Sequence, residues 1–182
     1  MSKIRNKNYY LFFFIAIISL VIALLFSFAD DGLIYDSQHK FQLWRLMTAH
    51  LVHTESHHLI ANLLAYALLI YLFPISWQKQ MQVFIFAMVL INCYLIVFSI
   101  ETYAGLSGVI YAIPGAYFFQ LLKEKRFLLA LIIILILMVY VFFISPQTAV
   151  INDANWKPLK SAHLLGFVAG FIMIFMNQYK SN

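Results

Sequence analysis

The chain has 182 residues, of which 64% are hydrophobic and only 10% are charged. Soluble domains contain about 45–50% apolar and about 25% charged residues, so this composition excludes an ordinary soluble protein and indicates one that crosses a membrane several times. The formal charge of +5 does not indicate nucleic-acid binding, because the basic residues lie in short loops between apolar segments. The single cysteine, Cys93, excludes a disulfide framework and a cysteine-based metal site.

Six apolar segments follow one another along the chain. They are residues 9–29, 58–73, 81–99, 108–122, 127–144 and 161–176. The first resembles a signal peptide, but its 21 residues exceed the roughly 7–15 of a secretory hydrophobic region and can span a bilayer of about 30 Å. We therefore expect an all-α membrane protein, in which residues 1–182 form a single domain built as a polytopic bundle of six transmembrane helices.

A long polar stretch, residues 30–57, lies between the first two apolar segments and contains four of the six histidines. Its Trp and Tyr residues are typical of a segment that lies at the membrane interface. Three of the histidines, His50, His53 and His57, could share one helix face and bind a metal ion. Their sequence lacks the His-Glu-x-x-His order of zinc proteases, so structural or interfacial roles are favoured and we expect no metal site.

Lysine and arginine are distributed unevenly between the two ends of the predicted helices. The termini and the even-numbered loops carry eight of the twelve basic residues, whereas the opposite side carries six of the seven acidic ones. Because cytoplasmic loops are enriched in Lys and Arg, this pattern predicts that both termini are cytoplasmic. The fourth segment would then begin at Ser107 near the outer face, and the sixth would begin near His163 at the same face.

A serine between two glycines, Gly105-Leu106-Ser107-Gly108, stands at the start of the fourth segment. The glycines allow a tight turn and the close approach of another helix. A serine presented in this way is a candidate nucleophile, with helix N–H groups nearby to stabilise a negative charge. The alternative is a packing role, because small residues recur every four positions from Ala104 to Ala116.

His58 and Asn62 lie one helical turn apart at the start of the second segment, so their side chains share a face. Polar side chains inside a membrane span are costly and usually face the interior of the bundle. The pair could form interhelical hydrogen bonds. It could also supply donors that, together with the backbone N–H of Ser107, stabilise an oxyanion.

His163 begins the sixth segment, beside a stripe of small residues at Ala162, Gly166 and Gly170. Alone, it could equally be a packing histidine. Packing this stripe against the small residues near Ser107 would bring the imidazole within hydrogen-bond reach of the hydroxyl, which is the geometry that a general base requires.

Tyr111 follows Ser107 by one helical turn and could lie against the imidazole of His163. No acidic residue is obviously placed to complete a triad. Asp153 precedes His163 by ten residues in a polar loop, where we expect it to be solvated. The residues therefore predict a Ser–His dyad.

Together these motifs resemble the rhomboid family of intramembrane serine proteases, over about residues 41–175. The matching motifs are Trp44-Arg45 followed by His58-x-x-x-Asn62, Gly105-Leu106-Ser107-Gly108 with Tyr111, and Ala162-His163-x-x-Gly166-x-x-x-Gly170. The resemblance implies that Ser107 is the nucleophile and His163 the base. It also implies an oxyanion hole at His58, Asn62 and Ser107, supported by Tyr111, Gly105, Gly108, Gly166, Gly170, Trp44 and Arg45.

The resemblance further implies a compact, six-helix bacterial protein of the inner (cytoplasmic) membrane. Such a protein would cleave membrane-anchored proteins, which have a transmembrane segment, near the outer face of the lipid bilayer and without a cofactor. Residues 35–44 and 48–53 also resemble rhombosortases, relatives thought to process proteins with a C-terminal Gly-Gly membrane anchor. Tyr111, however, is the ordinary rhomboid residue, and rhombosortases often differ there.

The main alternative is a catalytically silent rhomboid-like protein that binds transmembrane segments. Such relatives usually lack the serine or the histidine, and Ser107 and His163 are both present here. A transporter is less favoured, because the chain has no repeated halves or paired broken helices.

Overall fold

The computed structural model describes residues 2–25, 32–53, 55–73, 75–139, 149–151, 154–156 and 159–179, and these residues are mostly helical. The longer helices are α1 (Ser2–Leu25), α3 (Ser56–Leu72), α4 (Trp77–Val97), α6 (Ala112–Lys123), α7 (Phe127–Val139) and α8 (Lys160–Tyr179). The short elements are β1 (Tyr35–Asp36), η1 (Ser37–His39), α2 (Arg45–Thr48), β2 (Thr102–Tyr103), α5 (Ser107–Ile110), β3 (Ala149–Ile151) and β4 (Ala154–Trp156). Strands β1 and β2 form one antiparallel pair, and β3 and β4 form another.

Each of the six predicted segments is mostly helical in the residues that the structure describes, although α3 ends at Leu72 and α4 at Val97. Residues 26–29 and 140–144, at the ends of two predicted segments, lie outside those residues. The fourth segment is divided at Tyr111 into α5 and α6. Pro114 explains the division, because a proline has no N–H to donate to the carbonyl of Ile110, four residues earlier.

Two helices are long and apolar enough to cross a membrane, Trp77–Val97 and Lys160–Gln178. Three shorter apolar helices are also present, at Phe12–Ile22, Ser56–Leu72 and Phe127–Ile136. A helix rises about 1.5 Å per residue, so the 17 residues of α3 reach only about 26 Å. We expected six membrane-spanning helices, and two helices among the described residues have the full length for a span.

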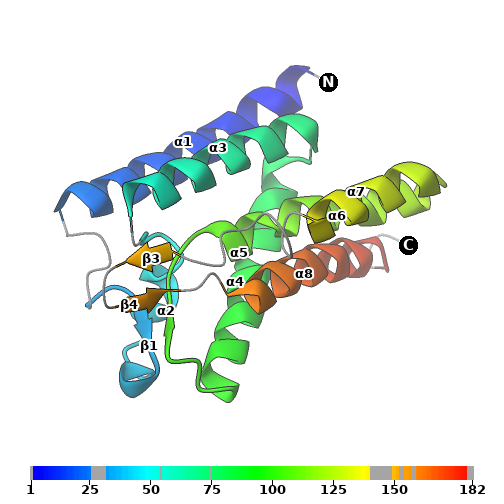
Figure 1. The fold of residues 1–182 in the computed structure, drawn as a ribbon. Coiled ribbons are helices and arrows are strands. Elements are labelled where there is room, and N and C mark those ends of the chain that lie inside the picture. Colours follow the sequence, from blue (N-terminus) through cyan, green and yellow to red (C-terminus); the bar gives the residue numbers. More distant parts are fainter. Residues whose placement is uncertain are drawn as a thin grey trace.

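Helix α8 lies at the centre of the helix packing and contacts α4, α5 and α6. Helices α1 and α3 lie side by side along another part of the molecule (Figure 1). The main hydrophobic core is shared by buried residues of α3, α4, α5, α6 and α8. The start of α1 and the end of α8 lie toward the same end of the molecule (Figure 1).

Helix α8 approaches α5 and α6 so closely that only glycine fits at the contacts. A Cβ atom on Gly166 would overlap the carbonyl oxygen of Gly108, and one on Gly170 would overlap the carbonyl oxygen of Ala112. From the opposite helix, a Cβ atom on Gly115 would overlap the carbonyl oxygen of Phe167. The two small-residue stripes therefore face each other, as their spacing predicts.

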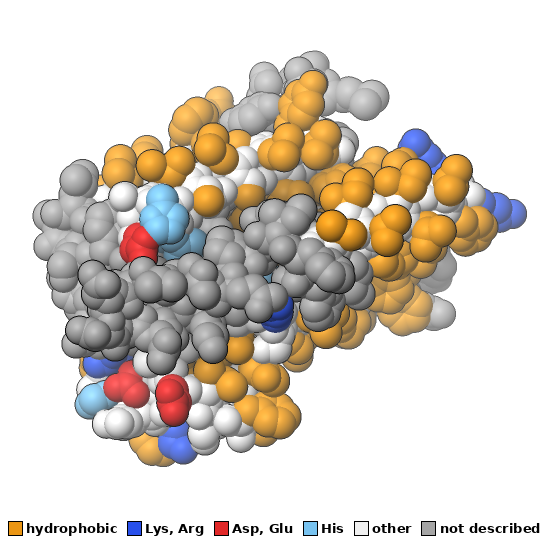
Figure 2. All heavy atoms as spheres, viewed as in Figure 1, with side chains coloured by type: hydrophobic (Ala, Val, Ile, Leu, Met, Phe, Trp, Pro, Cys, Tyr) orange, Lys and Arg blue, Asp and Glu red, His pale blue; other side chains and the backbone are white. Residues whose placement is uncertain are grey.

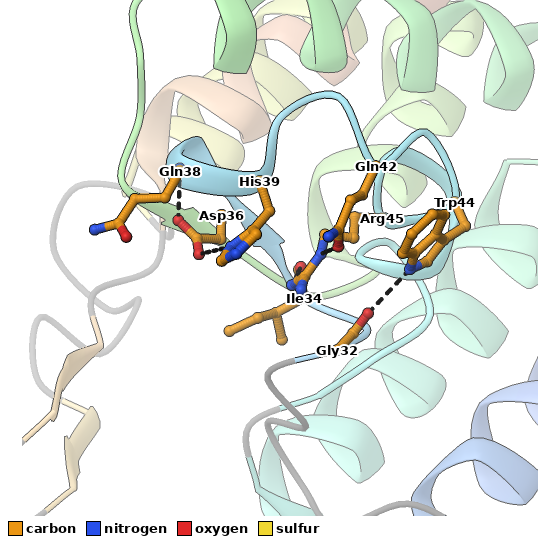
Figure 3. A network of polar contacts seen from close by, with 8 residues as sticks. All are labelled: Gly32, Ile34, Asp36, Gln38, His39, Gln42, Trp44 and Arg45. Carbon is orange, nitrogen blue, oxygen red and sulfur yellow. Dashed lines mark hydrogen bonds and ion pairs between the residues drawn. The ribbon is translucent and has the colours of Figure 1, made fainter.

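The loop from Gly32 to His53 is held together by side chains that bind backbone carbonyls (Figure 3). The buried guanidinium of Arg45 donates from Nη1 to the oxygen of Ile34 at 2.9 Å and from Nε to the Gln42 side chain at 2.6 Å. The indole of Trp44 donates to the oxygen of Gly32 at 3.1 Å. With few regular elements in this loop, these bonds satisfy backbone groups that would otherwise lack partners.

Hydrophobic side chains cover the flanks formed by α1, α3 and α7 (Figure 2). Lys and Arg side chains lie at the right-hand end of this view, where α6 is followed by α7, whereas the opposite half shows acidic side chains together with further Lys and Arg side chains (Figure 2). An apolar belt between charged ends is the surface expected of a protein that sits in a bilayer.

Candidate active site

Ser107 is the first residue of α5, and His163 lies in the first turn of α8. The close glycine contacts between these helices bring the two side chains together, although they are 56 residues apart in the chain. Ser107 Oγ lies 2.8 Å from His163 Nε2. In the neutral imidazole whose Nε2 is unprotonated, the hydroxyl donates to this nitrogen, which is the arrangement that activates a serine.

The ring of Tyr111 stacks on the imidazole of His163, with the ring centroids 4.6 Å apart and the planes 15° from parallel. His163 is buried, and its Nδ1 has no hydrogen-bond partner among the described residues. The orientation of the imidazole is thus held by the bond to Ser107 and by stacking. Asp153, which we expected to be solvated, lies outside the described residues.

Asn62 and His58, one turn apart on α3, lie against the loop that carries Ser107. Gly105 has a backbone φ of +117°, and a Cβ there would lie 2.9 Å from His58 Cε1 and 3.8 Å from Asn62 Nδ2. Asn62 is buried, and its Nδ2 has no hydrogen-bond partner among the described residues. A buried amide donor without a partner is unfavourable by about 1–3 kcal/mol, so its place against Gly105, two residues before Ser107, suits a group that binds developing negative charge.

The remaining predicted site residues are placed around this pair. Gly105 and Gly108 flank Ser107, and Gly166 and Gly170 provide the close contacts of α8. Trp44 and Arg45 bind within the loop of Figure 3, and no bond between them and the Ser107–His163 pair is seen among the described residues. Their contribution is to the shape of that loop.

The three histidines of the metal alternative do not share a helix face. Helix α2 ends at Thr48 and α3 begins at Ser56, so His50 and His53 lie between helices. The exposed His57 binds the Glu55 carboxylate at 2.6 Å. Within the described ranges, no three His, Cys, Asp or Glu side chains are grouped as a metal site requires.

His53 lies beside the candidate oxyanion site. Its Nδ1 binds the carbonyl oxygen of Leu51 at 3.0 Å, and its ring edge meets the ring of His58 with the centroids 5.0 Å apart. Burial, with a smaller contribution from His58, lowers the pKa of His53 to about 3. His53 is therefore neutral at physiological pH, and its Nδ1 carries the proton donated to Leu51.

Three further polar residues lie behind residues 104–108, which we call the serine loop. They are His50, Asn92 and Tyr103, and the sequence did not indicate that they support the candidate active site. His50 binds Asn92 at 3.1 Å, and the hydroxyl of Tyr103 donates to the carbonyl oxygen of Gly105 at 3.0 Å. The sequence could have indicated a role for Asn92, since it is a polar residue within the apolar segment 81–99. It could not have indicated one for Tyr103, because the hydrogen-bond partner of Tyr103 is a backbone atom.

The chain was compared with curated proteins and with models of protein families. A comparison with curated proteins found no match. The family model of the rhomboid domain matches residues 40–180, from the loop before α2 to the end of α8. This match includes the second part of the loop of Figure 3, with Trp44 and Arg45, and the His58–Asn62 face of α3. It also includes the loop that carries Ser107 and the histidine of α8. The chain therefore belongs to the rhomboid family.

Proposed function

We propose that this protein is an intramembrane serine endopeptidase that uses a Ser107–His163 dyad. Rhomboid proteins are generally intramembrane serine proteases, and their substrates are membrane proteins. The observation that carries the proposal is the 2.8 Å contact between Ser107 Oγ and His163 Nε2, at the start of two helices packed through glycine.

The proposed reaction begins when Ser107 Oγ attacks the carbonyl carbon of the scissile peptide and its proton passes to His163 Nε2. The negative charge that forms on the carbonyl oxygen is stabilised by Asn62 Nδ2, by His58 and by the backbone N–H of Ser107. His163 then protonates the leaving amine, and an acyl-enzyme on Ser107 remains. Water, activated by the same imidazole, releases the acyl group.

We further propose that the six helical segments cross the bacterial inner membrane, with both termini in the cytoplasm. Ser107 and His163 begin α5 and α8 at one end of the bundle, which supports a site near the outer face. Lys123, Lys125 and Arg126 lie at the opposite end of α6, toward which the start of α1 and the end of α8 also point (Figure 1). Basic residues at that end support its cytoplasmic placement.

The substrates proposed are proteins anchored by a transmembrane segment, which must unwind locally to expose a peptide bond. Gly and Pro lower the free energy of unwinding, so they should favour cleavage near the cut. Proteins with a C-terminal Gly-Gly anchor are the narrower candidate class, since residues 48–53 resemble rhombosortases.

The test is cleavage of a generic transmembrane substrate by the full chain reconstituted in liposomes, together with labelling by a serine-directed fluorophosphonate. Ser107→Ala and His163→Ala should abolish cleavage, and Ser107→Ala should abolish labelling. Ser56→Ala and His57→Ala, at exposed positions of α3, serve as matched controls.

Cleavage by the wild type alone would support the dyad. Labelling without cleavage would favour a narrow substrate range, such as Gly-Gly anchors. The absence of both signals in folded protein would contradict the proposal and favour a silent binder of transmembrane segments.

A further inference from the structure

A cluster of polar side chains lies directly behind the loop that carries Ser107. His50 follows α2, Asn92 belongs to α4, and Tyr103 ends β2, so the cluster joins three separate segments. His50 and Tyr103 are almost fully buried, at 1% and 3% exposure. Buried polar groups are costly unless they are paired, so the bonds within this cluster determine how the segments fit together.

The direction of each hydrogen bond follows from a backbone carbonyl, which can only accept. The carbonyl oxygen of Leu46 accepts from Asn92 Nδ2 at 2.9 Å, which turns Asn92 Oδ1 toward His50. His50 Nε2 lies 3.1 Å from that oxygen and must therefore carry the proton that it donates. Burial lowers the pKa of His50 to about 4, so the ring is neutral at physiological pH and its Nδ1 is an acceptor.

The Tyr103 hydroxyl connects this cluster to the serine loop. It donates its one proton to the carbonyl oxygen of Gly105 at 3.0 Å, so its 3.4 Å approach to His50 Nδ1 is a close polar contact and not a second full hydrogen bond. Burial raises the pKa of Tyr103, so the hydroxyl keeps its proton. The ring edge of His50 also meets the ring of Tyr103, with the centroids 5.2 Å apart, so the two side chains fix each other.

Both backbone polar groups of Gly105 are held from this side. Its carbonyl accepts from Tyr103, and its N–H donates to the oxygen of Ala49, the residue before His50, at 2.8 Å. A Cβ atom on Gly108 would lie 2.9 Å from the Tyr103 hydroxyl. The hydroxyl is therefore in contact with both glycines that flank Ser107.

The position of Gly105 matters because this residue also lies against the other side of the site. Its φ of +117° is a conformation that L side chains rarely adopt, and a Cβ there would lie 3.3 Å from His58 Nε2. Glycine is flexible, so the bonds on both of its polar groups are what restrict it. A small shift of this backbone would move Ser107 relative to His163 and Asn62.

We propose that His50, Asn92 and Tyr103 form a positioning unit that fixes the backbone on both sides of Ser107. The unit contacts the loop and not the reacting atoms, so its members are positioning residues. The effect on catalysis rests on the proposed function, whereas the fixing of the loop does not.

The test compares Tyr103→Phe with Tyr35→Phe, a matched control on the paired strand. Tyr35 lies opposite Tyr103 in the β1–β2 ladder, is also buried, and donates its hydroxyl to the carbonyl oxygen of Leu95 at 3.1 Å. Both variants remove one buried hydroxyl that binds a backbone carbonyl. Only Tyr103→Phe removes a bond to the serine loop.

Tyr103→Phe should lower kcat and the rate of fluorophosphonate labelling by about tenfold, the effect of one lost hydrogen bond, with KM unchanged. Tyr35→Phe should leave both rates within about twofold of the wild type, even if its thermal stability falls as far as that of Tyr103→Phe. Equal rate losses in the two variants would mean that the hydroxyls are merely structural, and would overturn the proposal.

Hydrogen–deuterium exchange tests the unit without any activity. The amides of residues 104–108 should exchange faster in Tyr103→Phe and at the wild-type rate in Tyr35→Phe. Unchanged exchange in Tyr103→Phe would overturn the proposal even if the enzyme cleaves substrates. Faster exchange in a chain that neither cleaves nor labels would support the unit and count against the proposed function alone.

A double variant tests whether His50 and Tyr103 act together. His50→Gln keeps a donor for Asn92 Oδ1 and removes the Nδ1 acceptor that faces Tyr103. If the residues form one unit, His50→Gln with Tyr103→Phe should lose about as much labelling rate as the more damaging single variant. Fully additive losses would show independent contributions and contradict the unit.

Discussion

The two sides of the candidate site are built differently. Ser107 and His163 lie where α8 meets α5 and α6, at contacts too close for any residue but glycine. Asn62 and His58 lie on α3, whose outer face exposes apolar side chains such as Leu64 and Leu68. The proposed nucleophile and base are thus fixed to each other by backbone contacts. The proposed oxyanion donors are attached through side-chain packing of the 17-residue helix α3.

The two attachments differ in how much displacement of the side chains each side can tolerate. A Ser–His pair must keep hydrogen-bond distance, and rigid helix contacts ensure it. The proposed donors of α3 would be needed only once charge forms on the substrate, so a less rigid attachment would be sufficient. The two sides should therefore respond differently to substitution.

The largest effect is expected on the rigid side. His163→Ala should lower kcat by at least about 10⁴-fold, because removing one member of such a pair removes the general base entirely. Steady-state cleavage of a transmembrane substrate measures this loss. Thermal unfolding serves as the control for folding. A loss below about tenfold would mean that another group activates Ser107.

A smaller loss is expected on the α3 side. Asn62→Ala should lower kcat by about 10²–10³-fold, the usual effect of removing one oxyanion donor. Asn177→Ala, which removes an amide that binds Gln82 near the end of α8, is the matched control and should keep full activity. Full activity in Asn62→Ala would remove Asn62 from the site.

The packing itself can be tested by stability. Gly166→Ala should destabilise the protein by about 1–3 kcal/mol or more, because the added methyl overlaps the carbonyl oxygen of Gly108. Leu64→Ala, on the exposed face of α3, should change stability by less than about 0.5 kcal/mol. Thermal unfolding in one detergent compares the two. Similar changes would mean that the two sides are equally rigid.

The last prediction concerns the stability of the protein at acidic pH. His50 and His53 have pKa values of about 4 and about 3 in the fold, below the usual value of about 6.5. Between pH 6.5 and 4 the unfolded chain binds more protons, so stability should be constant above this range and fall as pH decreases through it. The slope is at most about 1.4 kcal/mol per pH unit for each histidine.

Melting temperatures measured from pH 7.5 to pH 4.5 would show this slope. The slope should be smaller in His50→Gln, which lacks one of the two groups. An unchanged slope in that variant would mean that His50 titrates normally in the fold.

The sequence predicts helices well here because apolar runs mark them. All six segments are mostly helical where the structure describes them, and the four-residue spacing of small side chains indicates which faces of α6 and α8 meet. The number of full-length spans was less predictable, since run length does not fix where a helix ends. Pro114 is an example. It lacks the backbone N–H that would continue the helix, and the apolar segment is divided at Tyr111 into α5 and α6.

The supporting structure of the site was less accessible to sequence reasoning. Strands β1 and β2 have two residues each, too few for any alternation of polar and apolar residues. Tyr103 and Arg45 donate hydrogen bonds to backbone carbonyls. Every residue has such a carbonyl, so the sequence does not indicate which one accepts. His50 was noticed as a possible metal ligand, and only the fold reveals its pairing with Asn92.

The order of the two reacting residues along the chain has a consequence for biosynthesis. His163 is made 56 residues after Ser107, which is a delay of about 3–11 seconds at 5–20 residues per second. During this interval α5 and α6 have the serine but no imidazole beside it. Under the proposed mechanism, the nascent chain would be unable to cleave its neighbours in the membrane until α8 has been made and packed, so formation of the last contact would act as its activation step.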